Sequence, residues 1–227
     1  MSNIAHLSPD QDDGDAPLAD LAYRRLLDAI YQGRLPPGSV VNELALAQEY
    51  GTSRGPVREA VRRLQGIQLI TRQPYAKSRV ITLSTGSAIE LFELRMALEG
   101  MACNLAVRRI GDEDIDRLLR ELESHHSPQA GAAPKAFDFH ESIVRACGNN
   151  RIINALCGDL YHLLRIYRRH STSVLVERKE DAYKEHWQIL QAMKARQPEL
   201  AESLMRSHIG RATENLVRQL GDTTSSR

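Results

Sequence analysis

Three histidines in the C-terminal half have the chemistry and the spacing of a metal centre. His186 precedes Gln197 by 11 residues, and His208 follows Pro198 by 10 residues. If the turn between them joins two helices, a rise of about 1.5 Å per residue places both imidazoles about 16 Å from that turn. His140 lies on another mainly apolar helical stretch. Three converging neutral imidazoles would suit a divalent transition metal such as zinc or nickel, and the alternative is three core histidines, each with one hydrogen-bond partner.

The elements that must position these histidines are helices. From residue 84 to residue 220 apolar side chains recur at helical spacing, and no convincing strand pattern remains. Short connections between amphipathic helices favour an antiparallel all-α bundle of six or seven helices, followed by a polar tail at 221–227. The helices are predicted at about Ser87–Arg109, Asp112–His125, Pro134–Cys147, Arg151–His170, Ser173–Arg196 and Pro198–Leu220.

A second stretch whose side chains could bind a ligand is SRGPVREAVRRL, residues 53–64. Arg54, Arg58 and Arg62 recur at every fourth residue and therefore share one face of a predicted helix. The opposite face is apolar, and Ser53 and Pro56 suit the start of the helix. Guanidinium groups pair bidentately with guanine or clamp phosphates, so such a helix suits the major groove of DNA. The alternative is a solvated arginine face on a surface helix.

The flanking residues favour DNA binding. A short amphipathic helix precedes the turn at Gly51, and two β-rich runs, Leu69–Arg72 and Arg79–Leu83, follow the second helix. Helix, turn, helix and hairpin predict a winged helix over residues 18–83, with a basic wing tip that carries Lys77. Residues 51–80 contain seven basic side chains and one acidic side chain, a net charge of +6, whereas the whole chain has +1. The positive charge is therefore concentrated where nucleic acid would bind.

The composition indicates an ordinary globular protein. With 42% hydrophobic residues in 227, the chain can bury a core, and it has no apolar run long enough to span a membrane. Residues 1–17 lack the pattern of a signal peptide and are expected to form a disordered tail. We therefore expect a cytoplasmic protein in which Cys103, Cys147 and Cys157 are reduced thiols.

The N-terminal motifs resemble a known family. The run from Leu35 through NELALAQEYGTSRGPVREAVRRLQ is similar to the DNA-binding domain of GntR-type bacterial transcription regulators, and most of all to the FadR subfamily. The resemblance implies a homodimeric regulator, a repressor, on double-stranded palindromic operator DNA. Gly55 stands where the family usually has threonine, and the wing lacks the usual glycine. The residues expected at the DNA are Ser53, Arg54, Gly55, Pro56, Arg58, Arg62, Tyr75 and Lys77.

The C-terminal region resembles the FCD ligand-binding domain of the same subfamily. The shared blocks are ELRMALE at 93–99, FHESIVRACGN at 139–149, and the stretch Glu185–Ile209. The resemblance implies that residues 84–220 bind an effector and dimerise. In relatives an aspartate and three histidines hold a divalent metal that helps to bind a small carboxylate, and the three histidines named above fall on those positions. Ala136 stands at the aspartate position, so a three-histidine site completed by water or by the effector, and loss of the metal, both stay open.

Three further side chains are candidates for effector binding. Arg95, on the first helix of the bundle, could pair with a carboxylate, and its alternative is an ion pair with Glu99 four residues on. His162 lies 12 residues after Asn150, close to the expected level of His140 across the turn, so it could reach the same cavity, and Arg165 follows on the same helix.

These features support a ligand-responsive DNA-binding regulator that is not an enzyme. Its partners would be operator DNA, a carboxylate effector and a second copy, with no membrane. One alternative keeps the DNA binding and makes the bundle a purely dimerising module. A remote alternative is a metal-dependent hydrolase, which would need a general base, and Glu185 and Glu141 are expected to point away from the histidines.

Overall fold

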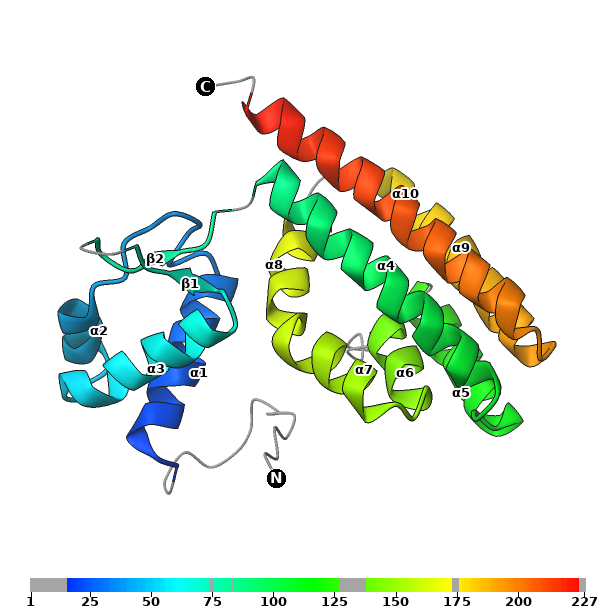
Figure 1. Ribbon diagram of the computed structural model, residues 1–227, viewed down its shortest axis with the longest axis horizontal. Helices are drawn as coiled ribbons and strands as arrows, with labels where there is room; N and C mark the ends of the chain where they lie inside the picture. Colours follow the sequence, from blue (N-terminus) through cyan, green and yellow to red (C-terminus); the bar gives the residue numbers. More distant parts are fainter. Residues whose placement is uncertain (1–15, 74–75, 83, 127–137, 173–175, 225–227) are drawn as a thin grey trace. The chain divides into compact units, whose positions relative to one another are not determined.

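The computed structural model describes residues 16–73, 76–82, 84–126, 138–172 and 176–224 and is mainly helical, as predicted (Figure 1). The chain divides into two compact units, Met1–Leu83 and Ser84–Arg227. Most of the tail expected at 1–17 lies outside the described residues. None of the helices that the structure describes has the length and apolar character to cross a membrane.

In its described part, the first unit contains three helices and a two-stranded antiparallel sheet. Ile70 pairs with Val80 and Thr71 with Arg79, and Val40 forms an isolated bridge to Arg79. The paired strands are shorter than the predicted β-rich runs, and the ladder consists of these two residue pairs. The elements are α1 (Leu18–Tyr31), α2 (Glu43–Glu49), α3 (Arg54–Gly66), β1 (Ile70–Thr71) and β2 (Arg79–Val80).

The positions of α2 and α3 follow from the residues at the helix ends and from the apolar face of α3. The side chain of Asn42 accepts hydrogen bonds from the first backbone N–H groups of α2, and Gly51 makes the turn before α3 with a φ of 66°. Ser53 occupies the N-cap position of α3, although its side chain makes no capping hydrogen bond. The predicted apolar face of α3 is buried against α1, and it consists of Val57, Ala60, Val61 and Leu64.

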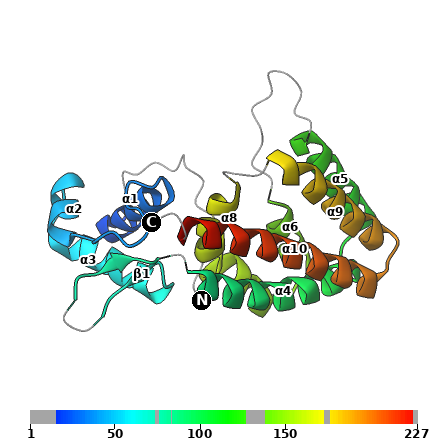
Figure 2. The same cartoon turned by 90° about the horizontal axis from the view of Figure 1, so that it is seen from above.

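The second unit is a helical bundle. Helix α10 packs against α4 and α9, α9 packs against α5, and α6 lies on α4 (Figures 1 and 2). Buried side chains of α9 and α10, among them Leu190 and Met205, form part of its core. The helices are α4 (Thr85–Val107), α5 (Asp112–His126), α6 (Phe139–Ala146), α7 (Asn150–Asn154), α8 (Tyr161–Thr172), α9 (Val176–Lys194) and α10 (Pro198–Thr224).

Three predicted helix boundaries are wrong. The helix expected at 151–170 is interrupted by a π-helical turn, Ala155–Asp159, where an extra residue in the turn separates α7 from α8. The described part of α6 begins at Phe139, because the Asp138 side chain accepts a hydrogen bond from the Glu141 backbone N–H and caps the helix. Helix α10 continues through residues 221–224 of the expected polar tail, where no proline interrupts its hydrogen bonding.

Helices α4 and α10 approach closely at Gly100. A Cβ atom there would lie 2.9 Å from Cγ of Arg206, so the arginine can cross α4 only because residue 100 is glycine. Arg206 also pairs with Glu202 one turn earlier on α10. The two helices that carry much of the bundle are thus in contact beside Glu99.

Candidate functional site

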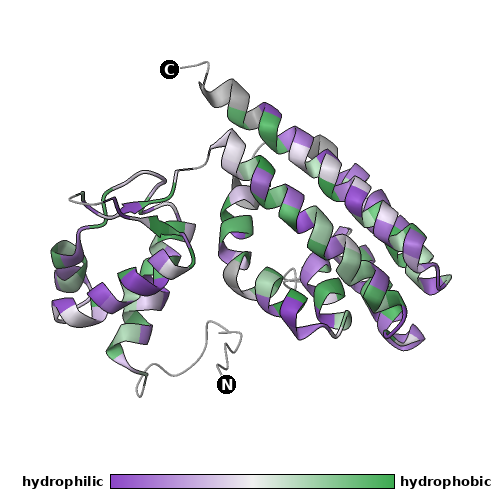
Figure 3. Ribbon diagram, viewed as in Figure 1, coloured by the Kyte–Doolittle hydropathy of each residue, from purple (hydrophilic) through white to green (hydrophobic). Residues whose placement is uncertain are grey.

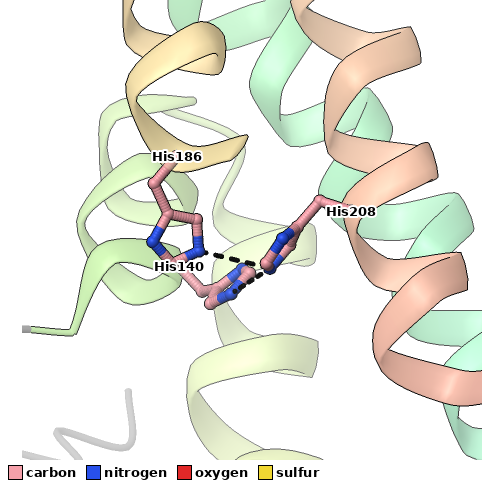
Figure 4. A group of neighbouring side chains, drawn as sticks. All are labelled: His140, His186 and His208. Atoms are coloured by element: carbon pink, nitrogen blue, oxygen red, sulfur yellow. Dashed lines mark hydrogen bonds between the residues drawn. The ribbon is translucent and has the colours of Figure 1, made fainter. Parts of the chain in front are cut away.

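The bundle brings the three predicted histidines together from three different helices. His140 comes from α6, His186 from α9 and His208 from α10 (Figure 4). The Nε2 atom of His208 lies 3.2 Å from Nε2 of His186 and 3.2 Å from Nε2 of His140. The ring of Phe139 stacks on His186 with centroids 3.9 Å apart, which holds that imidazole at the edge of the cluster.

Two glutamates hold the outer nitrogens of two of these rings. Oε2 of Glu99 lies 2.6 Å from Nδ1 of His140, and Oε2 of Glu185 lies 2.5 Å from Nδ1 of His208. An ionised carboxylate only accepts hydrogen bonds, so Nδ1 of each ring is the donor in these two contacts, and the Nε2 atoms of the rings face one another. Two Nε2 lone pairs at 3.2 Å would repel, so a proton or a metal ion must lie between them. The expectation that Glu185 points away from the histidines was therefore wrong, because α9 and α10 bring it against His208.

Each of these glutamates is backed by an arginine. Nε of Arg95 donates to Glu99 at 2.6 Å, and Nε of Arg211 donates to Glu185 at 2.6 Å. Burial pushes the pKa of the Glu185 carboxyl up, but the hydrogen bonds and charges of His208 and Arg211 outweigh burial and leave the pKa below its ordinary value. For Arg95, the structure shows the ion pair that was the alternative to effector binding.

The donor set fits a metal ion. Zinc–nitrogen bonds of about 2.0–2.1 Å place neighbouring ligand nitrogens roughly 2.8–3.4 Å apart at angles near 90–110°. The two Nε2 separations of 3.2 Å at His208 lie in this range, and the ligand atoms of all three histidines lie within 4.8 Å of one another. Among the described histidines, cysteines and acidic residues, His140, His186 and His208 form the group that could hold an ion. Carboxylates on the outer nitrogens are the usual partners of ligating histidines.

The other predicted effector residues lie on α8, outside this group. His162 is half-buried and makes an edge-to-face contact with the ring of Tyr161. Burial, and then the charge of Arg165, lower the pKa of His162 to about 4, so its imidazole is neutral near pH 7. Arg165 itself is exposed. The position expected to hold the family's aspartate, Ala136, lies outside the described residues.

A second site is the outer face of α3. Arg54, Arg58 and Arg62 are all exposed. Glu43 of α2 accepts from Nε of Arg58 at 3.4 Å, and Glu59 lies 3.5 Å from Arg62. A hollow of about 700 Å³ opens between α2, α3 and the wing, and its lining includes Arg54, Arg58, Arg72 and Lys77.

Of the other predicted DNA contacts, Lys77 lines this hollow. Ser53, Gly55 and Lys77 are exposed, Pro56 is half-buried in the first turn of α3, and Tyr75 lies outside the described residues.

Two more of the seven basic side chains in residues 51–80 are engaged in closer contacts within the first unit. NH1 of Arg63 lies 2.5 Å from Asp20 of α1, and its guanidinium stacks over the ring of Tyr23. NH1 of Arg79 donates to the Gly38 carbonyl at 2.8 Å. Both side chains are exposed, but their charges are already engaged by groups of the protein, so the sequence count of basic residues overstates the cations left for a partner.

Comparison with known proteins follows this division into two units. Residues 18–80 match the family "Bacterial regulatory proteins, gntR family", and residues 90–211 match the FCD domain. The chain belongs to the GntR family. A GntR-type helix-turn-helix followed by an FCD domain is the architecture of the FadR subfamily, as the sequence motifs indicated.

The similarity to GntR-family relatives covers most of the chain. A probable D-xylose utilization operon transcriptional repressor from Paenarthrobacter nicotinovorans is 31% identical over 79% of this chain and 80% of its own length. The HTH-type transcriptional repressor GlaR of Escherichia coli K12 is 29% identical over 82% of this chain and 90% of its own length. The chain is thus a transcription regulator, and its relatives are regulators and not enzymes.

Solved structures show the same GntR-family fold. E. coli McbR/YncC has a TM-score of 0.70 at 21% identity, over 90% of this chain and 99% of that one. Lar, which controls the expression of the Listeria monocytogenes agr system, has a TM-score of 0.56 at 19% identity, over 91% and 99%. At these identities the likeness supports the fold alone.

Glu99 and Glu185 are the residues of the candidate site that sequence reasoning missed as partners of histidine. The signal available was an acidic residue on an otherwise apolar helix face, four residues after Arg95 in the case of Glu99. Such spacing suggests a pair within one helix, but it does not identify a contact to a helix 41 residues away.

Proposed function

We propose that this GntR-family protein is a repressor that binds a palindromic operator as a homodimer and responds to a small carboxylate held in its helical unit through a divalent metal. The observation that carries the proposal is the set of Nε2 separations of 3.2 Å at His208, framed by carboxylates on the outer nitrogens. A DNA-binding regulator acts where the DNA is, so we propose a cytoplasmic site of action.

DNA binding is assigned to the exposed face of α3 and the hollow beside it. Arg54, Arg58 and Arg62 would enter or flank the major groove, where arginine pairs with guanine or with phosphates. Ser53 makes no capping hydrogen bond, so its hydroxyl is available to a phosphate. Lys77 and Tyr75 of the wing, and the backbone at Gly55 and Pro56, would contact the flanking DNA.

The effector would complete the coordination of the metal. Three histidines leave coordination positions for water or for an anionic oxygen, and a bound divalent ion supplies the positive charge that attracts a carboxylate. Arg95 is already paired with Glu99, so we propose that the metal, and not Arg95, is the main partner of the carboxylate. His162 and Arg165 on α8 remain candidates for the far end of the effector.

Dimerisation is assigned to an apolar face of α4. Leu94 and Met101 are 46% and 44% exposed, and their spacing of two helical turns places them on one face. Figure 3 shows hydrophobic segments recurring along this helix. A second copy packed on this face would present two winged helices to two half-sites of a palindrome.

Native mass spectrometry combined with elemental analysis of the purified protein tests the proposal. We expect a homodimer with about one zinc or nickel ion per chain, and a rise in thermal midpoint when metal and small organic acids are added. A metal-free dimer whose midpoint responds to neither would contradict the metal and the effector. That result would support the alternative in which the helical unit only dimerises.

A further inference from the structure

The buried ion pair between Arg95 and Glu99 extends to a histidine of the candidate metal centre. The two side chains are each 3% exposed, and they lie one turn apart on α4. Glu99 uses its oxygens differently: Oε1 accepts from Nε of Arg95, and Oε2 faces Nδ1 of His140 at 2.6 Å. One carboxylate thus joins a fixed cation on α4 to an imidazole on α6.

Stability of the fold does not by itself account for this arrangement. Removing two charges from water costs free energy that their attraction often fails to recover, and well-packed apolar side chains of similar size frequently stabilise a protein as well or better. A buried pair is therefore better explained by a requirement at the atom it contacts. Here that atom is Nδ1 of His140.

We propose that Glu99 is a positioning residue that fixes His140 as the Nδ1–H tautomer with its Nε2 lone pair toward His208, and that Arg95 holds the Glu99 carboxylate in the orientation that this contact needs. A neutral histidine has one protonated nitrogen, so occupation of Nδ1 by the proton leaves Nε2 as the ligand atom. The part concerning metal affinity rests on the proposed function. The part concerning the tautomer applies to the metal-free protein.

The second glutamate provides an internal comparison. Arg211 and Glu185 repeat the arrangement at His208, but Arg211 is 47% exposed, whereas Arg95 is 3% exposed. Solvent can replace Arg211 in part, and it cannot reach Arg95. His140 should therefore depend more strictly on its carboxylate than His208 does.

Glu99→Gln tests the proposal because its amide has nearly the same shape and can donate as well as accept at Nδ1. Glu202→Gln is the matched control: Glu202 is half-buried between α10 and α4, where it bonds Asn104 and Arg206. The His140 tautomer is measured in metal-free protein by long-range 1H–15N NMR, with His140→Ala for assignment. Zinc affinity is measured by competition with a chromogenic chelator.

We expect Glu99→Gln to shift His140 toward the Nε2–H tautomer and to weaken zinc binding about 10–100-fold, while Glu202→Gln changes neither. An unchanged His140 tautomer in folded Glu99→Gln protein would overturn the proposal, and so would zinc affinity equal to that of Glu202→Gln. Because Glu99→Gln leaves Arg95 without its carboxylate, the double variant Arg95→Met/Glu99→Gln removes both charges and repeats the test in a neutral core.

The two hypotheses fail in different ways. If the unaltered protein binds no zinc, the proposed metal function is wrong, yet the tautomer comparison in metal-free protein still decides the role of Glu99. If zinc binds tightly and the tautomer does not respond to Glu99→Gln, the metal function stands and the positioning role is wrong.

Discussion

Arg95 in the helical unit has surroundings opposite to those of the arginines on the outer face of α3. On α3 the guanidiniums of Arg54, Arg58 and Arg62 are exposed, and the latter two have acidic neighbours only at 3.4 and 3.5 Å. In the bundle, Arg95 is 3% exposed and lies 2.6 Å from its carboxylate. The exposed arginines can therefore bind another molecule, whereas the charge of Arg95 is neutralised by Glu99 inside the protein.

The largest expected effect tests the buried side of this comparison. Arg95→Met leaves the Glu99 carboxylate buried without its cation, and breaking such a pair costs about 3–5 kcal/mol of unfolding free energy. Urea denaturation of the helical unit measures the loss, and the double variant Arg95→Met/Glu99→Gln should recover most of it. A loss below about 1 kcal/mol for the single variant would show that the Arg95–Glu99 pair behaves like an exposed ion pair.

Removal of a histidine tests whether the cluster beside the buried ion pair binds zinc. His208 has an Nε2 atom 3.2 Å from both other rings, so His208→Ala should weaken zinc binding by more than the roughly 100-fold that loss of an outer partner can cause. Isothermal titration with zinc measures the change. His125→Ala at the end of α5 is the control, and equal affinities of the two variants would contradict the centre.

A smaller effect is expected on the exposed side. Arg58→Ala should weaken operator binding by about 1–3 kcal/mol if Arg58 makes a bidentate base contact. Arg63→Ala on the same helix is the control, because Arg63 is engaged with Asp20 and Tyr23. Mobility shifts at fixed salt should separate the two variants, and identical losses would mean that only total charge matters at this surface.

The smallest effect concerns pH. Because the pKa of Glu185 is lowered on folding, its contribution to stability is present above the ordinary carboxyl value of 4.5 and is lost as pH falls through the folded pKa. The unfolding free energy of the unaltered protein should therefore decrease more steeply below pH 4.5 than that of Glu185→Gln. Parallel curves in acid denaturation would show that the His208 and Arg211 contacts do not stabilise the carboxylate.

Local signals in the sequence were sufficient for the winged helix. The turn at Gly51, Pro56 in the first turn, and apolar residues at helical spacing define α3, and the structure confirms its buried face. Charge was less informative, because a count of basic residues does not distinguish Arg58, at the surface, from Arg63, which pairs with α1. That difference depends on which helix lies opposite each side chain.

The helical class of the second unit and the meeting of two of its histidines were predictable, but the interruption of one helix and a contact between two others were not. The similar distances of His186 and His208 from the turn at Gln197 and Pro198 correctly indicated that the two imidazoles meet. The π-helical turn at Ala155–Asp159 was not predicted: its one local signal is Gly158, and a single glycine within a helical pattern does not distinguish a π-helical turn from a continuous helix. The contact between Glu99 and His140 depends on the packing of α6 on α4, which a one-dimensional pattern does not contain.

The glycine at position 100 has a consequence for the histidines although it contacts none of them. It directly follows Glu99, and Arg206, whose Cγ would stand 2.9 Å from an added methyl group, precedes His208 by two residues. Any side chain at this position must push the Arg206 side chain, which is 44% exposed, away from α4 or move the two helices apart. Because His140 contacts Glu99 of α4 and His208 belongs to α10, separation of these helices would widen the gap between the two imidazoles.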